Sequence, residues 1–149
     1  MDTPEALETY AGREVAVTEW LTITQERIAR FAEATDDHQW LHVDEERAAR
    51  ESPFGGTIAH GFLTLSLLSK FMRDSLDIRG GARRLINYGL NRVRFISPVR
   101  AGSKIRARIE LQSFRRLADA CEGTFLITVE LEGAGKPCCV AEWIYRFYP

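Results

Sequence analysis

The sequence predicts an α+β fold in which a curved antiparallel sheet wraps around a long apolar helix. Residues 58–72 carry apolar side chains on nearly every face of a helix, and such a helix must be buried. Four stretches of alternating apolar and polar residues follow it, which is typical of consecutive antiparallel strands. This order of elements excludes a nucleotide-binding fold built from βαβ units.

The first part of the chain predicts one strand and two short helices. We expect the strand over residues 12–22. Thr24 is placed to cap a helix over residues 25–35. A polar loop over residues 36–43 follows, and Asp44 can cap the next short helix.

The second part predicts the central helix and the rest of the sheet. Gly80 and Gly81 are expected to end the helical region, and four strands follow at residues 85–96, 103–113, 123–131 and 139–147. A helix that is apolar on every side is shielded from water only if a sheet curls around it and another element covers its remaining side. That is the hot-dog arrangement. Its open sheet edge predicts a homodimer, because two sheets can pair edge to edge across a two-fold axis.

Length and composition indicate one ordinary globular domain over residues 1–149, since 45% of the residues are hydrophobic and 28% are charged. The longest apolar tract, residues 57–71, is shorter than the roughly 20 residues of a membrane-spanning helix. No apolar core of a secretory signal is visible near the N-terminus. We therefore expect a cytoplasmic protein without a membrane partner.

The net charge of -1 argues against a nucleic-acid partner but hides an asymmetry. Residues 1–60 hold 5 basic and 13 acidic side chains, whereas residues 61–116 hold 13 basic and 3 acidic ones. Only 3 of the 20 basic residues are lysines, and arginine is the side chain that forks onto phosphates and carboxylates. The basic segment is either a site for a phosphorylated ligand or a solvated face shaped by codon bias.

Three cysteines, Cys121, Cys138 and Cys139, are an odd number without CxxC spacing. They indicate neither a disulfide framework nor a zinc site. We expect buried, reduced thiols.

All three histidines, His38, His42 and His60, lie within 23 residues, and Asp36 and Asp37 directly precede the first of them. A carboxylate and an imidazole five positions apart can converge on one water molecule if the loop folds back. The alternative for His42 is a core histidine with satisfied hydrogen bonds. A zinc site is a third possibility, because His38 and His42 are four apart. The segment is not convincingly helical and has no Glu between the histidines, so no metal is expected.

A second group of residues, 55–62, is a glycine-bearing turn that runs into the apolar helix. Backbone N–H groups at a helix N-terminus can polarise a carbonyl or stabilise an enolate oxygen, and Gly61 would permit close approach. The alternative is that Gly55, Gly56 and Gly61 only shape the loop and its packing.

Together the two groups resemble a known family. The run Asp37-His38-Gln39-Trp40-Leu41-His42 resembles the Asp-x-Asn-Pro-Leu/Ile-His signature of the MaoC-like, (R)-specific enoyl-CoA hydratases, and Ile58-Ala59-His60-Gly61 resembles their second motif. The nodulation protein N-like branch is the most similar, with a His-Gln-Trp loop and a strand like residues 87–95. The resemblance covers residues 23–99. It implies a hot-dog dimer that reversibly hydrates trans-2-enoyl-CoA to (R)-3-hydroxyacyl-CoA and requires no cofactor.

Motif matching implies that Asp37 and His42 are the catalytic dyad and that the Gly61 amide binds the thioester oxygen. Further candidates for oxyanion or substrate contacts are Gln39, His60, Ser66 and Ser69.

Three positions depart from the family pattern: Asp36 replaces a glycine, Gln39 an asparagine and Trp40 a proline. Two adjacent carboxylates repel each other, so either Asp36 or Asp37 could face the pocket, and the motif spacing favours Asp37. Trp40 either walls the acyl pocket or packs in the fold.

Two other functions share the fold and the ligand. An acyl-CoA thioesterase would use the same activated water on the thioester carbonyl, and a non-catalytic acyl-CoA-binding subunit would have lost activity with the altered motif positions. In all three cases the CoA phosphates would meet basic side chains of the middle segment, for which the candidates are Arg83, Arg84, Arg92 and Arg94. Those that point outward on a strand could equally be ordinary surface residues.

Overall fold

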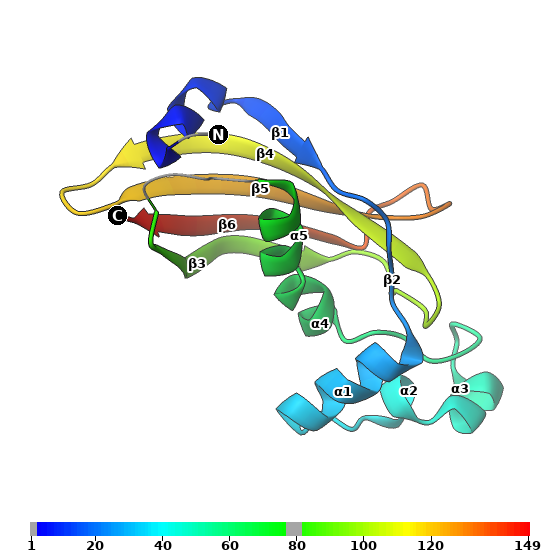
Figure 1. Ribbon diagram of the computed structural model, residues 1–149. Coiled ribbons are helices and arrows are strands. Elements are labelled where there is room, and N and C mark those ends of the chain that lie inside the picture. Colours follow the sequence, from blue (N-terminus) through cyan, green and yellow to red (C-terminus); the bar gives the residue numbers. More distant parts are fainter. Residues whose placement is uncertain (1–2, 77–81) are drawn as a thin grey trace.

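One antiparallel sheet dominates the computed structural model, which describes residues 3–76 and 82–149 (Figure 1). The strand order is β1-β4-β5-β6-β3, and a short β2 also pairs with β4. The strands are β1 (Arg13–Val17), β2 (Leu21–Thr22), β3 (Arg84–Phe95), β4 (Lys104–Arg116), β5 (Cys121–Leu131) and β6 (Cys139–Tyr148). The last four match the predicted strands closely, because their alternation of apolar and polar residues is regular.

The predicted strand over residues 12–22 is wrong as a single element, since it is divided into β1 and β2. The Thr18 hydroxyl accepts a hydrogen bond from the Ala107 N–H at 2.9 Å, and the Thr18 N–H donates to the Ala107 oxygen at 2.9 Å. This side chain therefore takes the place of a backbone acceptor, and regular pairing with β4 stops until Leu21.

The N-terminal helices are η1 (Pro4–Tyr10), α1 (Gln25–Thr35), α2 (Trp40–Val43) and α3 (Glu45–Glu51). Of these, α1 and α3 begin directly after the predicted capping residues. Thr24 accepts a hydrogen bond from the Arg27 N–H at 3.2 Å, and Asp44 accepts one from the Arg47 N–H at 2.9 Å. The sequence predicts neither the 3-10 helix η1 nor α2, and the expected loop over residues 36–43 is therefore wrong for its second half. In Figure 1, α1, α2 and α3 form a cluster beyond one end of the sheet.

The expectation of one long helix over residues 58–72 is also wrong. The apolar segment begins as extended chain, because Ile58 forms a β-bridge with Arg100 and the Ala59 N–H donates to the Val99 oxygen at 2.7 Å. Two short helices then follow, α4 (Gly61–Ser66) and α5 (Leu68–Ser75), separated at Leu67. Hydrophobic periodicity cannot separate a buried extended segment from a buried helix. The predicted break at Gly80 and Gly81 lies outside the described residues.

The core lies between the concave face of the sheet and the α4–α5 pair, which confirms the hot-dog arrangement (Figure 1). Fully buried side chains from β4 and β5 meet those of the two helices; they include Leu68, Phe71, Met72, Ile105, Ile109, Phe125 and Ile127. The burial is not uniform around the helices, since Phe62 on α4 is 67% exposed. Within the described ranges, every helix is too short or too polar to cross a membrane.

Candidate functional site

The fold brings Asp37, His42 and His60 together from three segments: the loop after α1, helix α2 and the residue before α4. One carboxylate oxygen of Asp37 and one ring nitrogen of each histidine all lie within 4.8 Å of one another. The two imidazole rings stack with their centroids 3.8 Å apart. The histidines are buried, whereas the Asp37 side chain is 55% exposed, so the cluster opens to solvent on the carboxylate side.

Backbone geometry decides which of the two adjacent carboxylates reaches the histidines. Asp36 ends α1 in the left-handed conformation, with φ of 56°, a region that favours glycine and that aspartate tolerates. The N–H groups of Asp36 and Asp37 both donate to the Ala32 oxygen. The chain turns back at this point and places an Asp37 carboxylate oxygen 3.9 Å from His60 Nε2. The conformation at Asp36 also explains why the family pattern has glycine there.

The protonation pattern of His42 follows from its partner. Its Nδ1 lies 2.7 Å from the Ile58 carbonyl oxygen, and a carbonyl can only accept a hydrogen bond. Nδ1 therefore carries the hydrogen, which leaves the Nε2 lone pair of the neutral ring available to accept a proton. This is the tautomer that a general base requires.

His60 contacts both of the other residues. The ring is 3% exposed and lies between His42 and Phe31, whose ring centroid is 5.0 Å away. Its Nε2 donates to the Asp37 carbonyl oxygen at 3.0 Å. Within the described part of the chain, Nδ1 of His60 is buried without a hydrogen-bond partner.

The cluster fits a bound water molecule better than a metal ion. Two imidazoles and a carboxylate are a donor set that zinc accepts, but each ligating nitrogen must hold the ion in the plane of its ring, about 2 Å away. The ring planes of His42 and His60 are only 26° from parallel, so no point at that distance lies in both planes. A water molecule hydrogen-bonded to two groups at about 2.8 Å spans up to about 5.6 Å, which covers the separations in the cluster.

Gly61 begins α4 directly after His60, so its N–H has no acceptor within the helix. A Cβ atom at this position would lie 2.9 Å from Cγ of Phe95, so close packing by itself requires glycine. A cavity of about 240 Å³ borders Gly61, Thr64, Phe95 and Cys138. Both interpretations of this glycine, packing and approach to a ligand, are compatible with this position.

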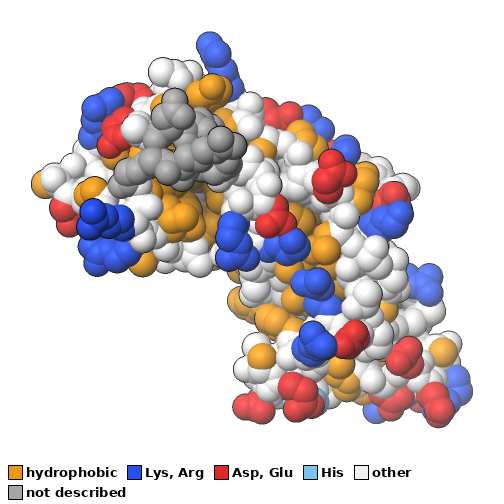
Figure 2. Space-filling model, viewed as in Figure 1, with side chains coloured by type: hydrophobic (Ala, Val, Ile, Leu, Met, Phe, Trp, Pro, Cys, Tyr) orange, Lys and Arg blue, Asp and Glu red, His pale blue; other side chains and the backbone are white. Residues whose placement is uncertain are grey.

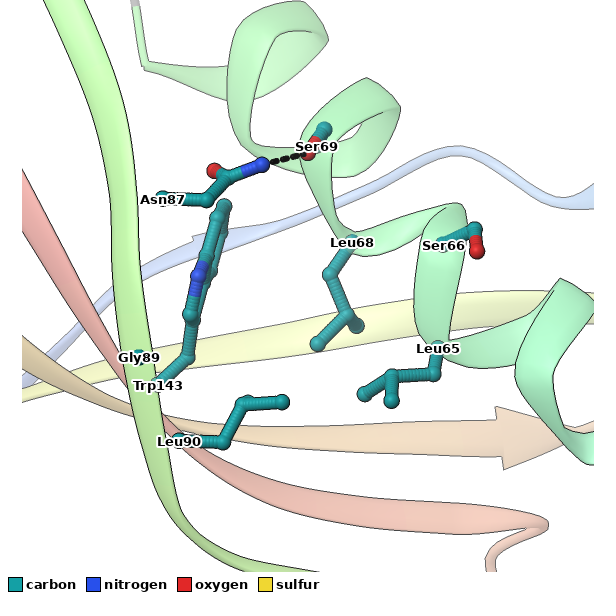
Figure 3. Close-up of a pocket in the computed structure, with 8 residues that line it drawn as sticks. All are labelled: Leu65, Ser66, Leu68, Ser69, Asn87, Gly89, Leu90 and Trp143. Carbon is teal, nitrogen blue, oxygen red and sulfur yellow. Dashed lines mark hydrogen bonds between the residues drawn. The ribbon is translucent and has the colours of Figure 1, made fainter.

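A larger apolar groove runs between the α4–α5 pair and strands β3 and β6. Figure 3 shows its first part, about 360 Å³, lined by Leu65, Ser66, Leu68, Ser69, Asn87, Gly89, Leu90 and Trp143. A second, more polar part of about 530 Å³ shares Ser69 and Asn87 with the first and continues to Met72, Arg73, Leu76, Leu85, Tyr145 and Phe147. The Asn87 amide donates to the Ser69 hydroxyl at 3.3 Å across the groove (Figure 3).

The remaining predicted site residues lie outside the cluster. Ser66 donates to the Phe62 oxygen at 2.7 Å, and Ser69 belongs to the groove wall. The Gln39 side chain is exposed at the start of α2, with its backbone N–H 3.5 Å from an Asp37 carboxylate oxygen. His38 is exposed beside Glu33.

Trp40 is half-buried, with the Arg47 guanidinium 4.4 Å from its ring centroid, and it lines neither part of the apolar groove. The four candidate arginines are exposed, but they form two pairs at opposite ends of β3: Arg83 and Arg84 at one end, Arg92 and Arg94 at the other. Ten residues of strand separate Arg84 from Arg94, a span of about 33 Å. The four side chains therefore do not form one cluster in a single chain.

The three cysteines are free and buried, as expected. Burial raises the pKa of the Cys138 thiol to about 12 and that of Cys139 to about 11. Neither thiol is poised to act as a nucleophile at neutral pH.

Two residues in the site were missed from sequence. The Gln25 side chain donates to the His42 carbonyl oxygen at 2.8 Å, and the Thr57 hydroxyl donates to the Gln25 side-chain oxygen at 2.5 Å. These partners are 17 and 32 residues apart, so no local pattern could have revealed them.

Comparisons with known proteins extend the match beyond the motif-bearing residues. Residues 7–131 match the family described as the MaoC like domain. The 3-hydroxyacyl-thioester dehydratase Z of Mycobacterium tuberculosis is 49% identical over 142 residues, which cover 95% of this chain and 93% of that protein. Nodulation protein N of Rhizobium leguminosarum bv. viciae is 49% identical over 134 residues, 89% of this chain and 83% of its own. An (R)-hydratase from A. caviae involved in PHA biosynthesis shares the fold, with a TM-score of 0.74 at 24% identity over 92% of this chain and 97% of that one.

Proposed function

Because the chain belongs to the MaoC-like domain family, we propose that it reversibly adds water to a trans-2-enoyl-CoA to give an (R)-3-hydroxyacyl-CoA. It is a hydro-lyase by family, and a relative of nearly the same length is named a 3-hydroxyacyl-thioester dehydratase. The observation that carries the proposal is the placement of an exposed carboxylate, Asp37, beside a buried imidazole, His42, at a spacing that one water molecule can bridge.

In the proposed reaction, Asp37 and His42 hold the water molecule by hydrogen bonds. The water oxygen bonds to the β-carbon of the enoyl group while one of the two residues takes its proton. The Gly61 N–H stabilises the negative charge that develops on the thioester oxygen. The residue that took this proton then returns it to the α-carbon, which completes the addition of one H₂O across the double bond and restores the pair to its starting state. His60 contacts both residues of the pair and holds them in place. Gln39 is exposed beside Asp37 and is proposed to contact the substrate.

Two surfaces support an acyl-CoA ligand. The apolar groove beside Ser69 is proposed for the acyl chain, since hydrocarbon is what its leucine and aromatic walls favour. Arg92 and Arg94 are proposed for the CoA phosphates, because they are exposed and follow the groove residue Leu90 along β3. Arg83 and Arg84 lie at the other end of β3, so they would contact the CoA phosphates only if a second copy of the chain brings them close to the ligand.

A homodimer paired along β3 is part of the proposal. β3 is at one edge of the sheet, opposite β1, and is 12 residues long. It carries exposed Leu85, Ile86, Tyr88, Leu90 and Phe95, a surface that monomeric proteins rarely leave open to water.

The test is turnover of crotonyl-CoA and of a long-chain trans-2-enoyl-CoA, followed by loss of the absorbance of the conjugated thioester. We expect Asp37→Asn and His42→Ala each to lower kcat/KM by about 100-fold or more, because each removes one of the two groups that hold and activate the water. His38→Ala is the matched control, since this histidine is exposed beside Glu33, and it should retain wild-type activity.

Two results would contradict the proposal. Release of free CoA thiol without hydration would indicate a thioesterase. Tight acyl-CoA binding by folded protein, with no turnover of either substrate, would indicate a binding subunit.

A further inference from the structure

The side chain of Gln25 joins two segments of the candidate site that are far apart in sequence. Its NH₂ group donates to the His42 carbonyl oxygen at 2.8 Å, and its oxygen accepts from the Thr57 hydroxyl at 2.5 Å. Thr57 is 5% exposed, and its own carbonyl accepts from the Ala101 N–H at 3.0 Å. This Gln25 bridge is therefore anchored in residues 57–58, which pair with residues 100–101 next to the sheet.

The orientation of the Gln25 amide is determined by its partners. The His42 carbonyl can only accept, so the NH₂ group must face it, and the amide oxygen then faces the Thr57 hydroxyl. Each of the three groups has one complementary partner. The bridge thus holds one rotamer of Gln25 at the first residue of α1.

The same short segment also contacts the His42 ring and the backbone of Leu41, the residue before it. The Ile58 carbonyl accepts from Nδ1 of the ring at 2.7 Å, and the Ile58 N–H donates to the Leu41 oxygen at 3.1 Å. Gln25 therefore ties the backbone of His42 to Thr57, the residue directly before Ile58, whose carbonyl orients the ring. If the bridge breaks, the carbonyl that sets the tautomer of His42 and the backbone that carries the ring are free to move independently.

We propose that Gln25 and Thr57 are positioning residues for hydration, which hold His42 with its Nε2 lone pair directed at the water-binding position beside Asp37. This inference rests on the proposed function. Neither residue touches the reacting atoms. Supporting hydrogen bonds of this kind are typically worth a factor of 10 to 100 in activity, because small displacements of a catalytic group are costly.

Two variants change a hydrogen bond with little change in volume, and a third keeps the hydrogen bond. Gln25→Glu places a carboxylate oxygen against the His42 carbonyl oxygen, so attraction becomes repulsion. Thr57→Val removes the hydroxyl, and Thr57→Ser keeps it. Gln112→Glu is the matched control, because Gln112 is exposed on β4.

We expect Gln25→Glu and Thr57→Val to lower kcat by about 10- to 100-fold with KM changed less than about twofold, and Thr57→Ser to restore most of kcat. A purely structural role would lower the amount of folded enzyme and leave kcat per folded molecule unchanged. Wild-type kcat in Gln25→Glu, or equal loss in Thr57→Ser and Thr57→Val, would overturn the proposal.

A second readout does not depend on turnover. In ¹⁵N-detected NMR of the imidazole groups, wild-type His42 should show one tautomer, protonated at Nδ1, whereas Gln25→Glu should show averaged or broadened signals. Identical His42 signals in the two proteins would overturn the positioning role. If wild-type protein hydrates no enoyl-CoA but this NMR difference is present, the failure lies with the proposed function and not with the bridge.

Discussion

At the scale of single residues, Glu122 on β5 is a buried carboxylate that two arginines share. Its side chain is 2% exposed and accepts hydrogen bonds from Arg115 and, at 2.7 Å, from Arg146 Nε. Burial alone would raise the pKa of this carboxyl group, but the hydrogen bonds and charges of the two guanidinium groups outweigh burial and lower it. Glu122 is therefore ionised in the folded protein, and the two guanidinium groups would lose their buried counter-charge if it were neutral.

We expect Glu122→Gln to lower the free energy of unfolding by about 2 kcal/mol at pH 7, measured by urea denaturation. Since the pKa is lower in the folded than in the unfolded protein, this stabilisation is complete above the unfolded value, about 4.3, and is lost as the pH falls through the folded value. The difference between wild type and variant should therefore shrink below about pH 4. Glu132→Gln, which alters an exposed pair with Lys104, is the control, and an equal effect at both sites would contradict the prediction.

At the scale of elements, α1 is the helix on which the site depends. It carries the bridging side chain of Gln25 at its start, Phe31 against His60 in its middle and the left-handed turn at Asp36 after its end. Capping therefore affects the site as well as the helix.

We expect Thr24→Ala to lower the free energy of unfolding by about 1 kcal/mol, because the Arg27 N–H loses its acceptor. Thr24→Ser keeps a hydroxyl at the cap and should stay close to wild type. Chemical denaturation of the three proteins measures the difference. Equal losses in the alanine and serine variants would show that packing of the Thr24 methyl group, and not the cap, is responsible.

At the scale of the whole molecule, the charge asymmetry of the sequence becomes a spatial one. Figure 2 shows acidic side chains gathered at the end of the molecule formed by α1 and α3. The candidate arginines follow β3 on the sheet, and this edge also exposes large apolar side chains. The surface best suited to bind another molecule is therefore the β3 edge.

We expect wild-type protein to sediment as a dimer and Ile86→Lys to weaken the dimer at least about tenfold, because a lysine on the edge strand opposes strand pairing. Ala134→Lys adds the same charge in the exposed β5–β6 hairpin and should leave the dimer intact. Sedimentation velocity over a range of concentrations measures both. A wild-type monomer at high concentration would contradict the paired edge.

Sequence alone was sufficient for features that depend on near neighbours. The regular strands, the caps at Thr24 and Asp44 and the two spaced motifs were all predictable, because alternation, capping and motif spacing act over a few residues. The choice of Asp37 over Asp36 was favoured by spacing, and the left-handed turn at Asp36 gives the physical reason.

Only the tertiary structure decided the features whose partners are distant in the chain. Pairing with residues 99–101 turned the start of the predicted long helix into extended chain, and Thr18 interrupted the first strand by bonding to Ala107. The bridge from Gln25 to Thr57 spans 32 residues, and the pair of Glu122 with Arg146 spans 24. Local periodicity describes only which face of a segment is apolar. The partner of each polar group depends on which segments the folded chain brings together, and that information is not contained in any short stretch of sequence.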